Sequence, residues 1–476
     1  MRPLESLLSL ANVLAVVHLV IPPLRTQRWT HHLGPIALLA WVLQVVFEGF
    51  RWQLVPAYLL TGIIMLFWML HRGARSASRT AGVPPNQLVL GLGVGLGSMG
   101  LLIATGLPLL FPVFRFPAPS GPYQIGTLTY HWVDESRHEA FSADPTARRE
   151  LMVQLWYPAH ADPASRRAPY VADARVFASM ARLLHLPAFM FSHFRDITTN
   201  AFPAAAVSDR ERTYPVLVFS HGRGGYRQHN TFQVEALVSH GYIVAAIDHP
   251  YAASGVVFPD GRDVRLDPRM MDRQFEDGII PFLAQDAVFT LNQLSALNRT
   301  DPNGVLAGRL DLQRVGIFGV SLGGEIGAEA CRQDARFRAL LSMDTWMPHS
   351  VVESGLDQPS MWITRDAASM RRERWTEPDI DRTLRTMRSV FERKASDGYF
   401  LQVPGMFHQD FSDAALFSPA TSLIGVTGPI NGARARAIVN AYSEAFFDRY
   451  LKGLAEPLLD IASPLYPDVL FERRPK

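Results

Sequence analysis

Cysteine is nearly absent from this chain of 476 residues, which contains only Cys331. A single cysteine excludes an internal disulfide and any metal site built from several thiolates, so we expect it to pack as a small hydrophobic side chain. An excess of charge of one sign is also lacking, because the formal net charge is only +2 and charged residues make up 19% of the chain. This balance gives no reason to expect nucleic acid as a partner.

Long apolar runs are concentrated in the first quarter of the chain. Four of them carry no formal charge, at residues 6–24, 33–47, 52–70 and 88–114. Three reach the roughly 18–20 residues that cross the hydrocarbon core of a bilayer, and the second can be extended through residues 48–50. A cleaved signal peptide explains only the first run. We therefore predict a four-span, all-α transmembrane region over residues 1–115, with the lipid bilayer as its partner.

Basic residues near the ends of these runs predict the orientation of the chain. The two connections between spans one and two and between spans three and four contain Arg25, Arg28, Arg72, Arg75 and Arg79, whereas the opposite side has Arg2, Arg51 and Arg115. Because cytoplasmic loops carry the excess of basic residues, both connections are predicted to be cytoplasmic and both termini to lie outside. In a bacterium, the C-terminal domain is then periplasmic or extracellular.

The fourth run contains a glycine pattern that resembles a cofactor site. Gly95, Gly97 and Gly100 match the dinucleotide-binding pattern G-x-G-x-x-G. That pattern binds a dinucleotide only between a strand and a helix, and no strand precedes it here. Small residues at this spacing also let transmembrane helices approach closely. We interpret these glycines as helix-packing residues, and we expect no cofactor.

The composition changes after Arg115 to a proline- and glycine-rich linker, and residues 116–476 are predicted to form a second domain. Short, almost continuously apolar runs predict strands at residues 151–156, 216–219, 242–247, 315–318, 339–343, 361–364 and 399–403. Helical patterns lie between them, for example at 283–297 and 434–451. This alternation indicates an α/β domain with a mostly parallel sheet covered on both faces. We expect 160–212 to be an irregular insertion over the site.

A G-x-S-x-G sequence lies between one predicted strand and a predicted helix. It consists of Gly319, Ser321 and Gly323 with Val320 and Leu322 between them. A sharp strand-to-helix turn of this kind holds the serine in a strained conformation with its hydroxyl exposed. The glycines are needed because side chains there collide with the neighbouring strand and helix. Ser321 is therefore the candidate nucleophile.

A serine hydroxyl needs a base to accept its proton, and only His349 and His408 follow Ser321 in the chain. His408 lies in a loop just after the last predicted strand, where chemistry gathers in a parallel sheet. His349 has no such placement, and we interpret it as a surface residue. His408 is the candidate base.

Two aspartates are candidates for the group that orients this base. Asp344 ends the strand after the helix of the serine turn, and Asp366 follows the next strand. Asp410 and Asp413 are too close to His408 in the sequence to be natural orienting partners. The position of the residues alone does not distinguish Asp344 from Asp366.

The negative charge that develops on an attacked carbonyl oxygen needs two backbone N–H donors. One comes from the residue after the nucleophile, which is Leu322. The second is expected from the glycine-rich loop at residues 220–225, which follows a predicted strand. Within it, Arg223 or Gly224 can supply the amide.

Five ordered segments and a histidine loop resemble the plasma-type platelet-activating-factor acetylhydrolases and their bacterial relatives, which are α/β-hydrolases. The segments lie at 121–123, 214–222, 239–246, 319–324 and 336–347, and the histidine loop lies at 407–411. The resemblance covers roughly residues 120–455. As an ordered set, these segments are more specific than any one of them.

The resemblance implies particular site residues. It assigns the acid to Asp344 rather than Asp366 and the oxyanion amides to Arg223 and Leu322, with no metal or cofactor. The sequence departs from the family pattern at two of the site positions. Arg223 replaces an apolar residue, and Val320 stands where histidine is frequent in the serine turn. The first change leaves the backbone amide in place but can alter substrate preference.

These expectations together describe a membrane-anchored serine esterase that hydrolyses a lipid or a small ester. The resemblance implies phospholipids with short or oxidised acyl chains as substrates. One alternative is a general carboxylesterase, or an acyltransferase with the same machinery. Another is a membrane scaffold whose hydrolase-like domain does not turn over. The sequence sets neither the acyl length nor the oligomeric state, and the intact set of Ser321, Asp344 and His408 favours an enzyme.

Overall fold

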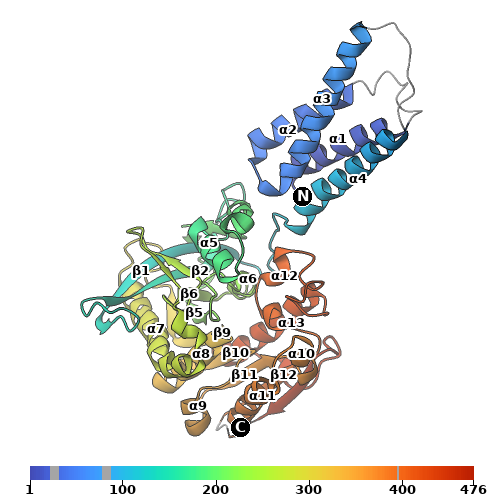
Figure 1. Cartoon of the computed structure of the whole chain (residues 1–476). Coiled ribbons are helices and arrows are strands. Elements are labelled where there is room, and N and C mark those ends of the chain that lie inside the picture. The colour runs from blue at the N-terminus through green and yellow to red at the C-terminus, as the bar shows by residue number, and fades with distance from the viewer. Residues whose placement is uncertain (22–31, 78–86, 394–395, 476) are drawn as a thin grey trace. The chain divides into compact units, whose positions relative to one another are not determined.

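The protein divides into two compact units in a computed structural model that describes residues 1–21, 32–77, 87–393 and 396–475. The N-terminal unit comprises residues 1–114 and 417–420, and the C-terminal unit comprises residues 115–416 and 421–476 (Figure 1). The N-terminal unit contains the long helices α1 (Pro3–Val20), α2 (Leu33–Glu48), α3 (Val55–Ala77) and α4 (Gln87–Leu110).

Helix length gives partial support to the predicted membrane region. Among the described residues, one helical stretch, Trp52–Leu70, is long and apolar enough to cross a membrane. Three apolar helical stretches are shorter, namely Pro3–His18, Leu33–Glu48 and Gly95–Leu110. Four spans therefore remain a prediction. Of the basic residues used for orientation, Arg25, Arg28 and Arg79 and the side chains of Arg72 and Arg75 lie outside the described part of the chain.

The glycines of the dinucleotide-like pattern lie inside helix α4, with no strand before them in the described residues. A Cβ atom added at Gly97 would lie 3.8 Å from Val16 of α1, and one at Gly100 would lie 3.9 Å from Leu60 of α3. Gly97 and Gly100 therefore face neighbouring helices, in partial agreement with the helix-packing interpretation, whereas nothing lies within 4 Å of a Cβ atom added at Gly95.

The C-terminal unit is built on one sheet of 11 strands, most of them in the order β13-β12-β11-β10-β9-β5-β6-β2-β1-β3, with β4 paired to β2. The central strands are β5 (Tyr214–Ser220), β6 (Ile243–Asp248), β9 (Leu310–Val320), β10 (Phe337–Met343), β11 (Ser360–Thr364) and β12 (Gly398–Gln402). All pairs between β6 and β12 are parallel. The flanking strands β2 (Arg148–His160) and β13 (Leu470–Arg474) join them in antiparallel pairing.

Each of the seven predicted strands is present, and the prediction of an α/β fold with a mostly parallel sheet is confirmed. The sequence analysis missed β1 (Gln124–His138) and β13 at the flanks. It was also wrong to expect 160–212 to be irregular, because this segment contains α5 (Ala174–Leu183), β3 (Ala201–Pro203) and β4 (Ala206–Val207).

Helices cover both faces of the central strands, which explains why these strands are apolar throughout. The larger ones are α6 (Thr231–Ser239), α7 (Arg273–Arg299), α8 (Leu322–Gln333), α11 (Glu377–Arg393) and α13 (Gly432–Phe447) (Figure 1). Strand β9 is an example of this two-sided packing, because successive side chains of a strand point to opposite faces of the sheet. Phe318 contacts Phe447 of α13, whereas Ile317 lies against Gly327 of α8. Cys331 is buried in α8, as expected.

Candidate functional site

The carboxyl ends of four parallel strands meet at one edge of the sheet. Val320 of β9 pairs with Met343 of β10, Met343 with Ile363 of β11, and Ile363 with Leu401 of β12. Residues one position further along these strands therefore form the next row, and this row contains both Ser321 and Asp344. The register alone brings two of the predicted site residues to neighbouring positions.

Ser321 occupies the turn between β9 and α8 in a strained backbone conformation. Its φ is 54° and its ψ is −130°, a region that residues other than glycine rarely adopt. The backbone N–H of Ser321 donates to the carbonyl of Met343 at 2.8 Å, which ties the turn to β10. As a residue, Ser321 is partly exposed, whereas the residues around it in the turn are buried.

Gly319 and Gly323 are required by close backbone approach at this turn. A Cβ atom at Gly319 would lie 2.3 Å from the backbone of Gly323. A Cβ atom at Gly323 would lie 2.0 Å from the carbonyl oxygen of Ser220, on the neighbouring strand β5. Real Cβ contacts do not occur at such distances, so any larger residue forces the strand and helix apart.

His408 and Asp344 are joined by a short hydrogen bond. His408 begins a 3₁₀ turn (His408–Phe411) after β12, and its Nδ1 lies 2.5 Å from Oδ2 of Asp344. Asp344 is fully buried, whereas 21% of the His408 side chain is exposed. Within the described part of the chain, Ser321 Oγ makes no hydrogen bond, to His408 or to another residue. Such bonds are often long in unliganded enzymes and shorten when substrate binds.

The ionised state of Asp344 is stabilised by its neighbours. Burial alone would raise the pKa of this carboxyl, but the positive charge of Arg365 and the hydrogen bond from His408 hold it well below its usual range. A permanently ionised carboxylate on Nδ1 keeps the imidazole proton there and leaves Nε2 free to act as a base.

The other candidates from the sequence lie elsewhere. Asp366 caps helix α10 (Ala367–Arg372) by accepting the N–H of Ser369 at 3.0 Å. His349 is exposed on α9 (His349–Ser354), where its Nδ1 lies 3.3 Å from Oε2 of Glu353. Of the two aspartates left open by position, it is thus Asp344 that contacts His408.

Sequence reasoning missed the residues that hold this pair in place. The fully buried Arg365 follows β11 and places its Nε 2.9 Å from Oδ2 of Asp344. It also pairs with Glu373, which accepts the backbone N–H of His408 at 3.1 Å, and the ring of Trp375 lies 4.1 Å from its guanidinium. Arg365 therefore pairs with both carboxylates that hold His408: Asp344, which contacts the ring, and Glu373, which accepts the backbone N–H. In the sequence, the only sign of this role is that Arg365 directly follows a strand that ends at the same edge of the sheet as Ser321 and Asp344.

Two buried aspartates fix the loop that carries His408. Asp410 accepts the backbone N–H groups of Phe407 at 2.7 Å and Gly428 at 2.6 Å. Asp413 accepts the N–H of Phe232 at 3.1 Å, in the first turn of α6, and burial raises the pKa of Asp413 to about 7. Asp410 therefore holds the backbone of the loop itself, and Asp413 ties the end of the loop to α6.

The glycine-rich loop after β5 lies against the Ser321 turn. A Cβ atom at Gly222 would lie 3.1 Å from Cβ of Ser321. The N–H of Gly224 donates to the carbonyl of Ala252 at 2.8 Å, so it is already used. Within the described residues, the backbone N–H of Arg223 and that of Leu322, the first residue of α8, have no acceptor. These two amides are therefore free to act as the oxyanion donors that the sequence predicts.

The side chain of Arg223 is held by α7 and by the turn that precedes it. Its Nη1 lies 2.9 Å from Oε2 of Glu276 and 3.1 Å from the carbonyl oxygen of Met270. Burial raises the pKa of Glu276, an effect that the charge of Arg223 opposes.

The described residues contain no group of three or more histidine, cysteine, aspartate or glutamate side chains that could hold a metal ion.

The fold and the site define a class of protein: an α/β protein with a serine in a strained turn, and an Asp–His pair, at the carboxyl edge of a parallel sheet. The family model described as "Platelet-activating factor acetylhydrolase, isoform II" matches residues 110–261 and 298–456. The chain belongs to this family and is a carboxylic ester hydrolase.

Individual relatives agree with this assignment. A "Probable 1-alkyl-2-acetylglycerophosphocholine esterase" of Arthroderma benhamiae is 26% identical over 78% of this chain and 97% of its own length. The platelet-activating factor acetylhydrolase of Bos taurus is 27% identical over 63% of this chain and 71% of its own length. Among solved structures, a ferulic acid esterase from Streptomyces cinnamoneus is 29% identical with a TM-score of 0.61, covering 76% of this chain and 99% of that one.

We expect Gly323→Ala to destabilise the protein by about 1–3 kcal/mol or more, because its Cβ must displace the backbone of β5. The matched control is Gly278→Ala in α7, where nothing lies within 4 Å of the added Cβ. That change should stabilise the protein by about 0.5–1 kcal/mol through the loss of backbone freedom in the unfolded chain. Thermal unfolding of both variants measures the difference, and equal effects contradict the steric argument.

We expect Arg365→Gln to cost about 3–5 kcal/mol at neutral pH, because it leaves the buried carboxylate of Asp344 without its cation. The pKa of Asp344 is lowered in the folded state, so the stability it contributes is present above its unfolded pKa and is lost as the pH falls. The gap in melting temperature between variant and wild type should therefore be complete at pH 7 and narrow as the pH falls below about 4, the unfolded pKa of an aspartate. Arg371→Gln, which removes an exposed pair with Glu377, is the control and should change little. A gap that widens in acid argues against this role.

Proposed function

We propose that this protein hydrolyses carboxylic esters through an acyl-enzyme on Ser321, with His408 as the base and Asp344 as the acid that orients it. The observation that carries the proposal is the 2.5 Å hydrogen bond between His408 Nδ1 and Asp344 Oδ2 beside the strained Ser321 turn. It is supported by the strand register, which puts the serine and the aspartate in one row.

In this mechanism, Nε2 of His408 removes the hydroxyl proton as Ser321 Oγ attacks the ester carbonyl. The amides of Arg223 and Leu322 then stabilise the oxyanion, and Asp344 stabilises the imidazolium. The imidazolium gives its proton to the leaving alcohol as the ester bond breaks. Water, deprotonated by His408, hydrolyses the acyl-enzyme and restores the serine. No metal or cofactor takes part in any of these steps.

Glycerophospholipids with a short or oxidised acyl chain are the substrates that family membership favours. The relatives named as acetylglycerophosphocholine esterase and acetylhydrolases point to release of acetate from the glycerol backbone. The likeness to a ferulic acid esterase supports a second candidate, a carboxylesterase that accepts aromatic acyl groups. Comparing acetyl phospholipid with methyl ferulate distinguishes the two.

We further propose that residues 1–115 form four membrane spans that anchor the catalytic domain at 116–476. The pattern of burial in the N-terminal unit supports this. Its helices bury polar side chains, including Glu5, Asn12, Gln44 and Thr61. Large apolar side chains face outward, including Leu10, Leu39, Phe47 and Leu59.

The buried polar side chains of this unit pair with one another. Thr61 Oγ1 donates to Asn12 at 2.9 Å, and the Tyr58 hydroxyl donates to Gln44 at 2.7 Å. Apolar side chains outside and paired polar ones inside suit a lipid surrounding.

We expect Ser321→Ala to abolish hydrolysis of p-nitrophenyl acetate, and Asp344→Asn to lower kcat by about 10⁴-fold because the imidazole then takes the wrong tautomer. Asp366→Asn is the matched control, since an asparagine also caps a helix, and it should retain activity. Initial rates on detergent-solubilised protein measure all three, with circular dichroism to establish folding. Persistent turnover by a folded Ser321→Ala variant would rule out the mechanism.

The orientation predicted from the basic residues can be tested with reporters at the C-terminus. Alkaline phosphatase fused after Lys476 should be active and β-galactosidase fused there inactive, because the former requires export and the latter the cytoplasm. The reverse pattern overturns the periplasmic placement. A fusion protein that washes off the membrane in carbonate overturns the anchoring itself.

A further inference from the structure

Two buried histidines lie next to the loop that supplies the Arg223 amide. His221 directly follows β5, and His249 directly follows β6. Both are fully buried, and their ring centres are 5.3 Å apart. Nδ1 of His221 lies 2.7 Å from the carbonyl oxygen of Gly222, and the backbone N–H of His249 donates to Nε2 of His221 at 3.1 Å. The ester-hydrolysis mechanism uses neither ring directly.

The contacts of His221 allow a single proton arrangement. A backbone N–H can only donate, so Nε2 of His221 must be an acceptor without a proton. A neutral ring then carries its proton on Nδ1, which donates it to the Gly222 carbonyl. Burial and the neighbouring His249 lower the pKa of His221 well below its usual range, which keeps the ring neutral.

The Gly222 carbonyl and the Arg223 N–H belong to the same planar peptide group. In a trans peptide they point in opposite directions, so a fixed oxygen also fixes the direction of the N–H. Two donors hold this oxygen, Nδ1 of His221 and the N–H of Gly225 at 2.8 Å. Hydrogen bonds to the carbonyl also polarise the peptide and strengthen the N–H as a donor.

His249 is held in turn by a buried network. Its Nε2 lies 2.7 Å from Oγ of Ser220, and its Nδ1 lies 2.8 Å from Oδ2 of Asp286. Burial alone would raise the pKa of Asp286, but the charge of Arg149 and the hydrogen bond from His249 hold it well below its usual range. The carboxylate therefore accepts the Nδ1 proton, and Nε2 is hydrogen-bonded to the serine hydroxyl.

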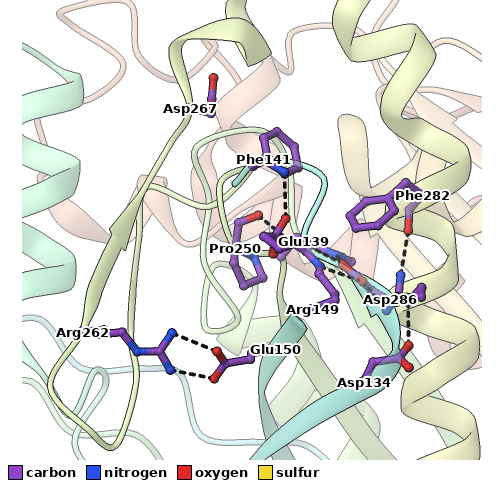
Figure 2. A network of polar contacts seen from close by, with 12 residues as sticks. Asp134, Glu139, Phe141, Arg149, Glu150, Pro250, Arg262, Asp267, Phe282 and Asp286 are labelled. Carbon is purple, nitrogen blue, oxygen red and sulfur yellow. Dashed lines mark hydrogen bonds and ion pairs between the residues drawn. The ribbon is translucent and has the colours of Figure 1, made fainter. Parts of the chain in front are cut away.

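Arg149 anchors this network to the rest of the domain. Figure 2 shows Glu139, Pro250 and Asp286 gathered around its guanidinium. It donates to Asp286 at 2.6 Å and 3.1 Å, to Glu139 at 3.0 Å and to the Pro250 carbonyl at 3.2 Å. Strand β2, helix α7 and the segment after β6 are thereby joined behind the loop.

We propose that His221 is a positioning residue that aims the Arg223 N–H at the developing oxyanion. The backbone N–H of His249 holds His221 in the tautomer that does so, and Asp286 holds His249 in place through its ring. This inference rests on the proposed function, because it assigns a role within the oxyanion site of that mechanism. It adds two histidines and a carboxylate that act on the transition state through a single peptide group.

Two substitutions of His221 separate its two contacts. Asparagine places an N–H near the position of Nδ1 and keeps the donor to Gly222, whereas glutamine reaches the position of Nε2 and keeps only the acceptor for His249. We expect His221→Gln to lower kcat by about 10- to 100-fold with little change in KM, since only a transition-state contact is misaligned. His221→Asn should restore at least a third of the wild-type kcat. His160→Gln, at an exposed histidine, is the matched control.

A transition-state analogue provides a readout that a purely structural role does not move. A trifluoromethyl ketone forms an oxyanion on Ser321, so its affinity should fall in His221→Gln in proportion to kcat/KM. Substrate hydrolysis and analogue binding are measured on the full-length solubilised protein, with rates normalised to the folded fraction. An unchanged kcat in His221→Gln, or an equal loss in both His221 variants, overturns the inference.

Wild-type protein offers a test that does not depend on the folding of any variant. Nitrogen-15 NMR of labelled histidine distinguishes the two neutral tautomers, and His221 should remain protonated on Nδ1 from pH 5 to 9. A proton on Nε2 overturns the inference. The proposed function is judged separately by Ser321→Ala: activity in that variant refutes the mechanism, whereas inactivity together with a failed His221 test refutes only the positioning role.

Discussion

The register of four parallel strands is the constraint on which the site depends. Because β9, β10, β11 and β12 end within one row of each other, the residues that follow them meet at a single edge of the sheet. Ser321 and Asp344 occupy adjacent places in that row, and both have positive φ. A slip of one residue between β9 and β10 would turn side chains to the other face and separate the pair. The apolar packing of both faces by α8 and α13 holds the register.

Much of this arrangement could be predicted from the sequence because burial leaves a plain signal. The central strands are covered on both faces, so they are apolar throughout, and the serine turn needs glycine where backbones approach to 2.0 Å. His408 could be located by its position after the last strand. Strands β1 and β13 gave no comparable signal, because they lie at the flanks with many exposed or half-exposed residues.

The remaining parts of the site depend on contacts between distant segments. Asp344 and Asp366 look alike in sequence, since both follow a strand, and only the three-dimensional structure shows that one contacts His408 while the other caps a helix. Arg365 has the same difficulty, because its partners Asp344 and Glu373 are brought to it by different elements. Helix α5 lies in a segment without strand periodicity, so the sequence did not predict its place in the fold. Its Leu183 occupies the space that a side chain at Gly224 would need.

The same arrangement of residue types occurs twice in this domain. Asp344 accepts from His408 and Arg365, and Asp286 accepts from His249 and Arg149. In each case the arginine stabilises a buried carboxylate, and the carboxylate fixes one tautomer of the imidazole. What differs is access, since 21% of the His408 side chain is exposed while that of His249 is completely buried. A partly exposed imidazole can exchange protons with a substrate, whereas a fully buried imidazole can only form hydrogen bonds with its neighbours. Burial, rather than the choice of side chains, therefore separates the group proposed as the catalytic base from the group proposed to position its neighbours.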